Sequence, residues 1–560
     1  MSEAIGRRTF LKGMGGMAGA VLLGACNPSR PPVNAANRTV RVKSWGDLGY
    51  PSPFIYVAGP GYWRMSLLFD SLTWPDATGE QLPWLAKSYK RSEDGLLWSV
   101  ELRDAKWDDG RPVTAGDVAF TYEYYTDQVF TPLLTGVPRP GVDVRATGEK
   151  SVEFRLGAPE ATFLQQTLGT MPIVPEHIFS TIEDPQSVFD DRVFIGCGAY
   201  RLDSKNVNAD TEAYVAKPDY YLGTPYVKRI EMIGVPDDDE IAALRIGVLD
   251  GAGARAEGVR DEVLAPIRAK PKEFGLIERP AGFAFPLFFN LTKGGPLADL
   301  RFRRACVHAL DRQDMVKRLL TGNGEVGSAG WLPPSNPYFS AAGVRTYPFD
   351  RPLAERILDE AGYRRAGASG PRMGLDGSPL RFTLTIPDLV PIALAELIVA
   401  NLGAVGVQID IKLERVDLVR TYGAKLAANY DLVVQSYPGP SGTGPGGDPD
   451  QLRGVYHSSP PSQTHKATGY KNPEVDRLID AQLATLDVEE RKRLVARIQQ
   501  IVSEDLPAMM LYYTTFYFAF RQSVFDAWYY TPGGFATGLS DAYNKHAYIT
   551  GRQKGLDFRS

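Results

Sequence analysis

Strand-like and helix-like segments alternate along both halves of this 560-residue chain, and this alternation limits the choice of fold most strongly. Residues 381–386 and 407–413 alternate polar and apolar side chains as strands do, and residues 392–402 between them have a helical pattern. Such a unit implies two parallel strands joined by a right-handed crossover. The length corresponds to about three to five domain-sized units, which is too much chain for one sheet. The sequence therefore predicts an α/β protein of two lobes, with added material in the first.

Local signals predict the remaining elements. Thr114 and Asp117 have the spacing of a capping box and predict a helix that runs to about Tyr125. Asn472 followed by Pro473 predicts the start of another helix. Further strands are expected at residues 38–45, 96–103, 151–156, 227–235, 285–289 and 509–520, and further helices at 237–249, 302–310 and 488–504.

Composition excludes several classes of protein. The 62 Lys and Arg against 66 Asp and Glu give a formal net charge of −4, which is too balanced for a dedicated nucleic-acid binder. Only 5 His and 3 Cys are present, which leaves little material for a metal site or for thiol chemistry. No metal site and no cofactor are therefore expected. Cys197 and Cys306 either form a disulfide or are two small buried side chains, and we favour the second interpretation.

The first 25 residues resemble a twin-arginine lipoprotein signal. Arg7 and Arg8 precede the short apolar stretch 13–25, which falls below the roughly 20 residues that a membrane-spanning helix needs. Cys26 directly follows this stretch in a pattern similar to a lipobox, which implies lipidation of Cys26. Residues 26–37 are rich in Pro and Asn and predict a tether. We expect a lipid-anchored protein in the periplasm or at the cell surface; a plain signal peptide is the alternative.

Motifs spread over the chain resemble one known family. Residues 84–118 contain Trp98, Trp107 and the run Asp109-Gly110-Arg111-Pro112, and residues 299–312 and 446–450 add further matches in the same order. Together they resemble the family 5 extracellular solute-binding proteins, the peptide, nickel and opine receptors of ABC transporters. The resemblance covers about residues 40–530, with departures at Gly116 and at residues 197–199.

The resemblance implies a fold and a domain division. The fold would be the two-lobed periplasmic-binding-protein fold (type II, cluster C) with an extra small domain in the first lobe. Lobe I would comprise residues 38–82, 186–284 and 517–560, the inserted subdomain residues 83–185, and lobe II residues 285–516. Two strand hinges would lie near residues 285–290 and 511–516.

The resemblance also implies the function and the partners. The protein would capture a peptide between the lobes and deliver it, as a monomer, to an ABC permease. An oligosaccharide, an opine or a nickel chelate remains an alternative ligand. A rival class, an extracellular hydrolase, would need a nucleophile with its base or a pair of carboxylates, and the sequence shows neither. We expect a binding protein and not an enzyme.

Seven residues are candidates for ligand binding by their family positions. Asp448 lies in a glycine-rich loop and would hold the ammonium group of a peptide, with Asp450 as a second carboxylate. The alternative for both is a solvated turn. The aromatic candidates are Tyr50, Tyr62 and Trp63, which follow the first strand, and Trp331 and Tyr437, which lie in lobe II. The alternative for each of them is packing in a core.

Overall fold

The computed structural model describes residues 38–44, 51–55, 58–127, 141–206, 210–236, 239–255, 261–367, 370–387, 390–414, 430–438, 447–459, 468–530 and 544–559. The predicted signal (1–25), the tether (26–37), Cys26 and Tyr50 lie outside these residues.

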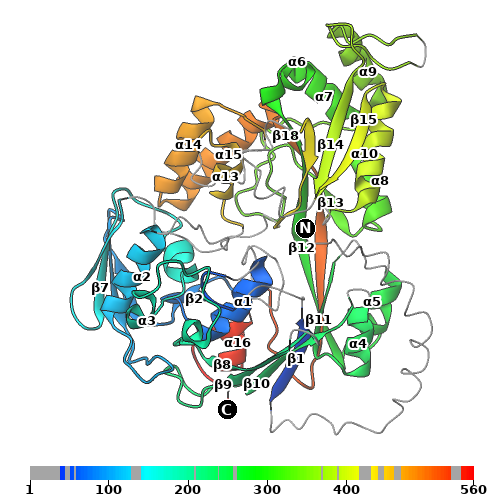
Figure 1. Cartoon of the computed structure of the whole chain (residues 1–560). Helices are drawn as coiled ribbons and strands as arrows, with labels where there is room; N and C mark the ends of the chain where they lie inside the picture. The colour runs from blue at the N-terminus through cyan, green and yellow to red at the C-terminus, as the bar shows by residue number, and fades with distance from the viewer. Residues whose placement is uncertain are drawn as a thin grey trace, which may run out of the picture.

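A long sheet runs through the whole molecule (Figure 1). Its strands follow the order β15-β14-β16-β12-β18-β11-β1-β10-β9-β8, with β13 paired to β18 and β17 paired to β12. Their bounds are β1 Thr39–Ser44, β8 Tyr200–Asn206, β9 Thr211–Ala216, β10 Arg229–Gly234, β11 Gly251–Arg255, β12 Phe274–Phe289, β13 Gly324–Val326, β14 Arg381–Pro387, β15 Gln408–Glu414, β16 Leu432–Val434, β17 Tyr437–Pro438 and β18 Ala508–Arg521. Strands β11, β1, β10, β9 and β8 lie in lobe I, and strands β16, β14 and β15 lie in lobe II.

Two strands, β12 and β18, run from one lobe into the other. Residues 274–279 of β12 pair with residues 516–521 of β18, beside the lobe I strand β11. Residues 287–289 of β12 pair with the lobe II strand β16. The register of β12 against β18 shifts between Arg279 and Phe283, so β12 bulges where it leaves lobe I.

Lobe I has its main core on one side of the sheet. Helices α1 (Ala58–Leu68) and α16 (Lys545–Thr550) contribute to this core, together with a second sheet of order β4-β5-β7-β6. The second sheet comprises β4 Ala86–Arg91, β5 Leu97–Leu102, β6 Asp143–Ala146 and β7 Ser151–Arg155, with α2 Ala115–Asp127 and α3 Glu176–Phe179 nearby. A short hairpin of β2 (Thr73–Pro75) and β3 (Gln81–Pro83) precedes it. On the other side of the sheet, α4 (Glu240–Ile246) and α5 (Asp261–Arg268) share a smaller core (Figure 1).

Lobe II has a core on each face of its sheet. One contains α6 Gly295–Ala298, α7 Leu300–Ala309, α8 Arg312–Leu319, α9 Arg351–Glu360 and α10 Ile392–Ala404. The other contains α13 Gln451–Tyr456, α14 Pro473–Ala484 and α15 Val488–Asp505. Strands β14 and β15 are parallel and α10 connects them, which confirms the predicted strand–helix–strand unit. The two-lobed α/β fold is therefore confirmed.

Several local predictions can be compared directly with the structure. The capping box forms, because Thr114 Oγ1 accepts the Asp117 N–H at 3.2 Å and Asp117 Oδ2 accepts the Thr114 N–H at 2.8 Å. Helix α4 ends at Ile246, earlier than predicted, because Gly247 takes a φ of 80° and terminates it. Cys197 and Cys306 are free thiols, each buried in a different core. This confirms the interpretation favoured from the sequence, two small buried side chains. No helix in the described part of the chain is long and apolar enough to cross a membrane.

Candidate functional site

Trp331 is the centre of an aromatic cluster in lobe II. Its ring lies edge-on to Tyr437 at 5.4 Å and to Tyr456 at 5.7 Å, and its Nε1 donates to Gln451 Oε1 at 3.1 Å. Its backbone has a φ of 78°, which is unfavourable for a bulky residue. Tyr513 Oη holds this conformation by donating to the Trp331 carbonyl at 2.6 Å. The structure thus brings Trp331 and Tyr437 together, beside the start of α13.

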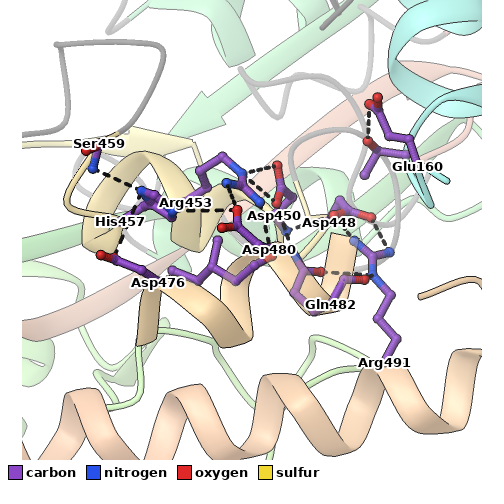
Figure 2. A network of polar contacts seen from close by, with 12 residues as sticks. Glu160, Asp448, Asp450, Arg453, His457, Ser459, Asp476, Asp480, Gln482 and Arg491 are labelled. Carbon is purple, nitrogen blue, oxygen red and sulfur yellow. Dashed lines mark hydrogen bonds and ion pairs between the residues drawn. The ribbon is translucent and has the colours of Figure 1, made fainter. Parts of the chain in front are cut away.

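Asp448 lies just before α13 and forms a buried ion pair with Arg491 of α15 (Figure 2). Arg491 donates to both carboxylate oxygens, at 2.7 and 2.8 Å, and the two residues are 5% and 3% exposed. Burial disfavours the charged guanidinium, but Asp448 outweighs this effect and raises the pKa of Arg491. The carboxylate of Asp448 is therefore already neutralised, and a ligand ammonium would have to share it with Arg491.

Asp450 belongs to the same polar network. Its Oδ1 accepts from Arg453 Nε at 3.1 Å and from Gln482 Nε2 at 2.7 Å. Gln482 in turn accepts from Arg491 Nε at 2.9 Å, and Arg453 reaches Asp480 at 2.6 Å. The network ties α13, α14 and α15 together, so both candidate aspartates hold these helices in place.

The inserted subdomain touches lobe II beside this network. The Ala161 N–H donates to the Leu483 carbonyl at 2.8 Å. A side chain at Gly95 would come within 2.6 Å of Leu486 Cδ1, so the backbone at Gly95 packs directly on the α14–α15 turn. Figure 2 shows the neighbouring Glu160 at the edge of the polar network. We call these contacts the lobe contact; it is a place where the two lobes meet.

Tyr62 and Trp63 lie on α1 in the core of lobe I. Tyr62 is 3% exposed and its Oη donates to the Thr170 carbonyl at 2.7 Å. Trp63 is 1% exposed, and its ring lies 6.4 Å from the ring of Tyr548. Both therefore pack in the main core of lobe I, whereas Trp331 belongs to a core of lobe II. A role for them in ligand binding remains a prediction.

Two arginines of interest escaped the sequence-based candidates. Arg491 had a usable signal, since it falls on the apolar face of its helix with Val495, Ile498 and Val502. A charged side chain in such a row needs a buried partner. Arg279 lies in the part of β12 that no strand pattern predicted, and nothing in the sequence marked it.

The described residues contain no group of three or more His, Cys, Asp or Glu side chains that could hold a metal ion.

Two lobes joined by two crossing strands define the class of periplasmic binding proteins. The family model of bacterial extracellular solute-binding proteins, family 5 (middle), matches residues 80–460, so the chain belongs to this family of extracellular binding proteins. Protein XP55 of Streptomyces lividans is 30% identical over 451 residues, which cover 79% of this chain and 77% of that protein.

Solved structures agree with this assignment. The oligopeptide-binding protein AppA of Bacillus subtilis is 24% identical over 531 residues, covering 92% of this chain and 94% of AppA. Its structure in complex with a nonapeptide superposes with a TM-score of 0.74 at 22% identity, covering 90% of this chain and 97% of AppA. AgaA of Agrobacterium tumefaciens, solved with agropinic acid, gives a TM-score of 0.71 at 21% identity, covering 90% and 97%. These likenesses establish the fold.

Proposed function

We propose that the protein is the receptor subunit of an ABC importer, and that it captures a peptide between its lobes and presents it to the membrane permease. The observation that carries this proposal is the agreement of the fold with AppA, a peptide-bound receptor, over 97% of the AppA chain. Strands β12 and β18 supply the joint about which two such lobes can move.

Capture requires that the ligand bind the closed form better than the open form. In this proposal the lobe contact belongs to the closed form and contributes to its stability. It consists of the bond between Ala161 and Leu483 and the packing of Gly95 on Leu486. A ligand between the lobes would add contacts that only the closed form offers. The permease would then recognise the closed, loaded receptor.

For the binding surface we propose Trp331 and Tyr437 in lobe II, with Tyr50, Tyr62 and Trp63 as the lobe I candidates. Trp331 is as buried as Tyr62 and Trp63, at 2% exposed, so this role requires the lobe II aromatic cluster to open toward the ligand. Asp448 and Asp450 remain candidates for a ligand ammonium. Arg491 and Arg453 already engage their carboxylates, so such a role requires the ion pairs to be shared or broken.

A thermal-shift panel tests the ligand class. The mature protein, with Cys26→Ser, would be heated with dipeptides, tetrapeptides, nonapeptides, agropinic acid, a nickel–histidine chelate or cello-oligosaccharides. A ligand at about 100 times its Kd stabilises the folded state by roughly 2.7 kcal/mol, so a true ligand raises the Tm. We expect peptides to do so. If only the opine, the chelate or the sugar raises the Tm, the peptide assignment is wrong.

For the location we propose export through the signal at residues 1–25 and lipidation of Cys26. Mass spectrometry of the mature N-terminus is expected to show a lipid-modified Cys26, and Cys26→Ser is expected to release the protein from membranes. A mature chain that begins elsewhere would contradict the anchor.

A further inference from the structure

Trp331 combines a strained backbone with a fully packed side chain. Its φ of 78° lies in the left-handed region, which a bulky residue adopts only at a cost. Its side chain is buried and lies against the rings of Phe288, Tyr437 and Tyr456. Glycine would adopt this conformation without strain, yet the chain places a glycine at position 330 and a tryptophan here. Strained residues of this kind cluster at ligand clamps and switch regions.

The hydroxyl group of Tyr513 closes the turn that carries Trp331. Its O–H donates to the Trp331 carbonyl at 2.6 Å, and its oxygen accepts the Ser328 N–H at 3.3 Å. Tyr513 is fully buried, and burial raises the pKa of its phenol, so the group remains a donor at any physiological pH. A tyrosine has a single O–H donor. This donor is therefore committed to the strained residue.

The same turn is fastened to the strand that joins the lobes. The Gly327 N–H donates to the Leu511 carbonyl of β18 at 3.1 Å. Tyr513 lies two residues further along β18 and pairs with Ala284 of β12, just beyond the bulge at which β12 leaves lobe I. The backbone of Trp331 is therefore held from the crossing strand, through one hydroxyl group.

In this conformation Trp331 is occupied by contacts within lobe II. Its Nε1, the one polar group of its side chain, donates to Gln451 Oε1 at 3.1 Å. The indole must leave these contacts before it can pack on a ligand. Relief of the backbone strain favours this movement. The bond from Tyr513 and the packing against Tyr437 and Tyr456 oppose it.

We propose that the Tyr513 hydroxyl is a latch that keeps Trp331 inside the lobe II core until a ligand enters between the lobes. The inference rests on the proposed function, in which Trp331 contacts the ligand, and it adds how that contact is controlled. Tyr513 is a positioning residue, because it acts through Trp331 and does not touch the ligand. Removing the latch raises the affinity for ligand, because a larger fraction of the molecules has Trp331 released before binding.

The first experiment tests whether the hydroxyl imposes the strain. Alanine at position 331 keeps the cost of the left-handed conformation and glycine removes it, so Trp331→Gly is expected to have a higher Tm than Trp331→Ala. Where the backbone is unstrained, alanine is the more stabilising of the two. In the Tyr513→Phe background the backbone can relax, and the order of the two Tm values is expected to reverse. The same order and difference with and without the hydroxyl overturns the proposal.

The second experiment follows Trp331 by fluorine NMR in protein that contains fluorinated tryptophan, with Trp331→Phe to assign the signal. In ligand-free Tyr513→Phe the signal is expected to move and to respond to D2O, as an exposed indole does. Tyr347→Phe is the matched control. Tyr347 is equally buried in the other core of lobe II, and its hydroxyl donates to the Ser503 carbonyl at 2.8 Å. A Trp331 signal in Tyr513→Phe that coincides with that of the wild type overturns the proposal.

The third experiment measures binding of tetra-alanine, a nonapeptide and agropinic acid by calorimetry. Tyr513→Phe is expected to bind about fivefold more tightly than the wild type, the factor that corresponds to one hydrogen bond. Tyr347→Phe is expected to bind like the wild type, and Trp331→Ala more weakly. An affinity of Tyr513→Phe that equals or falls below that of the wild type overturns the latch.

These outcomes separate the latch from the peptide assignment. If agropinic acid binds more tightly to Tyr513→Phe and no peptide binds, the peptide assignment fails and the latch stands. If peptides bind equally well to Tyr513→Phe and to the wild type, the latch fails and the peptide assignment stands. If none of the three binds, the ligand-free experiments decide. A released Trp331 signal together with the reversed order of Tm values supports the latch, and the absence of either overturns it.

Discussion

At the scale of single residues, two buried ion pairs join segments that are far apart in sequence. Asp448 and Arg491 connect the start of α13 to α15. Asp70 and Lys545 connect α16 to the core of lobe I, with Nζ and Oδ1 2.6 Å apart and both side chains fully buried. Breaking such a pair by removing one partner is costly, because the other charge stays buried and uncompensated.

Asp448→Asn is expected to destabilise the protein by about 3–5 kcal/mol, the usual cost of leaving a buried charge unpaired. Urea denaturation measures this loss, and the double variant Asp448→Asn/Arg491→Met should recover much of it. Asp410→Asn is the control, because Asp410 forms an exposed pair with Arg381 and should cost less than about 1 kcal/mol. A variant Asp448→Asn that keeps its stability but loses ligand affinity would assign the carboxylate to the ligand instead of to Arg491.

The pair of Asp70 and Lys545 gives a prediction that depends on pH. Burial lowers the pKa of Lys545, and Asp70 offsets part of this effect. Asp70→Asn removes the offset, so the pKa of Lys545 falls further below its unfolded value of about 10.4. Between the two pKa values the unfolded chain binds more protons than the folded chain, so stability rises with pH. We expect a loss of about 3–5 kcal/mol at pH 7 and a smaller loss at pH 9, by urea denaturation.

Tyr220→Phe is the matched control for this pH dependence. It removes one hydrogen bond to Asp70, at 2.8 Å, but leaves the charge pair intact. Its cost should be about 1 kcal/mol and nearly equal at the two pH values. An Asp70→Asn deficit that is the same at pH 7 and pH 9 would contradict the assigned role of Lys545.

At the scale of secondary-structure elements, short-range signals account for where helices begin. Asn472 Oδ1 accepts the N–H of Glu474 at 3.0 Å at the start of α14, and the Thr114–Asp117 box opens α2. Asp117 has a further task, because its Oδ1 accepts the Glu176 N–H at the start of α3. One cap therefore orders two helices of the inserted subdomain.

Thr114→Ala should weaken the start of α2 by about 1 kcal/mol, because the Asp117 N–H loses its acceptor. Hydrogen exchange measures this effect locally. The amides in the first turn of helix 115–127 should exchange roughly fivefold faster, because the free energy of local opening falls by about 1 kcal/mol. Thr114→Ser keeps the hydroxyl and should exchange like the wild type. Unchanged exchange in Thr114→Ala would show that Asp117 and tertiary packing hold the helix without the box.

The sequence predicted elements well where a local signal exists and poorly where distant packing decides. The strands at 381–387 and 408–414 and the helix between them were predictable from periodicity alone. The strand β12 was predicted only from residue 285, because Pro280 and Gly282 interrupt the pattern at the bulge. The ion pair of Asp448 could not be predicted either, since its partner lies 43 residues away on another helix.

At the scale of the whole molecule, two features control the relation between the lobes. In the proposed capture mechanism the lobes move about the crossing strands β12 and β18, and the lobe contact holds them together on the side of the inserted subdomain. Ala161 contacts the last turn of α14, and Gly95 contacts Leu486 between α14 and α15. Both helices are tied to Asp448 and Asp450 through Arg491 and Gln482. Opening of the lobes must therefore separate the subdomain from a rigid, ion-paired surface.

Leu486→Ala is expected to favour the open form, because it removes the side chain on which Gly95 packs. Small-angle scattering should give a larger radius of gyration for the ligand-free variant than for the wild type, and ligand affinity should fall because fewer molecules are closed. Ile246→Ala is the control, since Ile246 is 78% exposed on α4 and takes no part in the lobe contact. If Leu486→Ala and the wild type have the same radius and affinity, the lobe contact does not influence closure, and the equilibrium is controlled at the strands β12 and β18 alone.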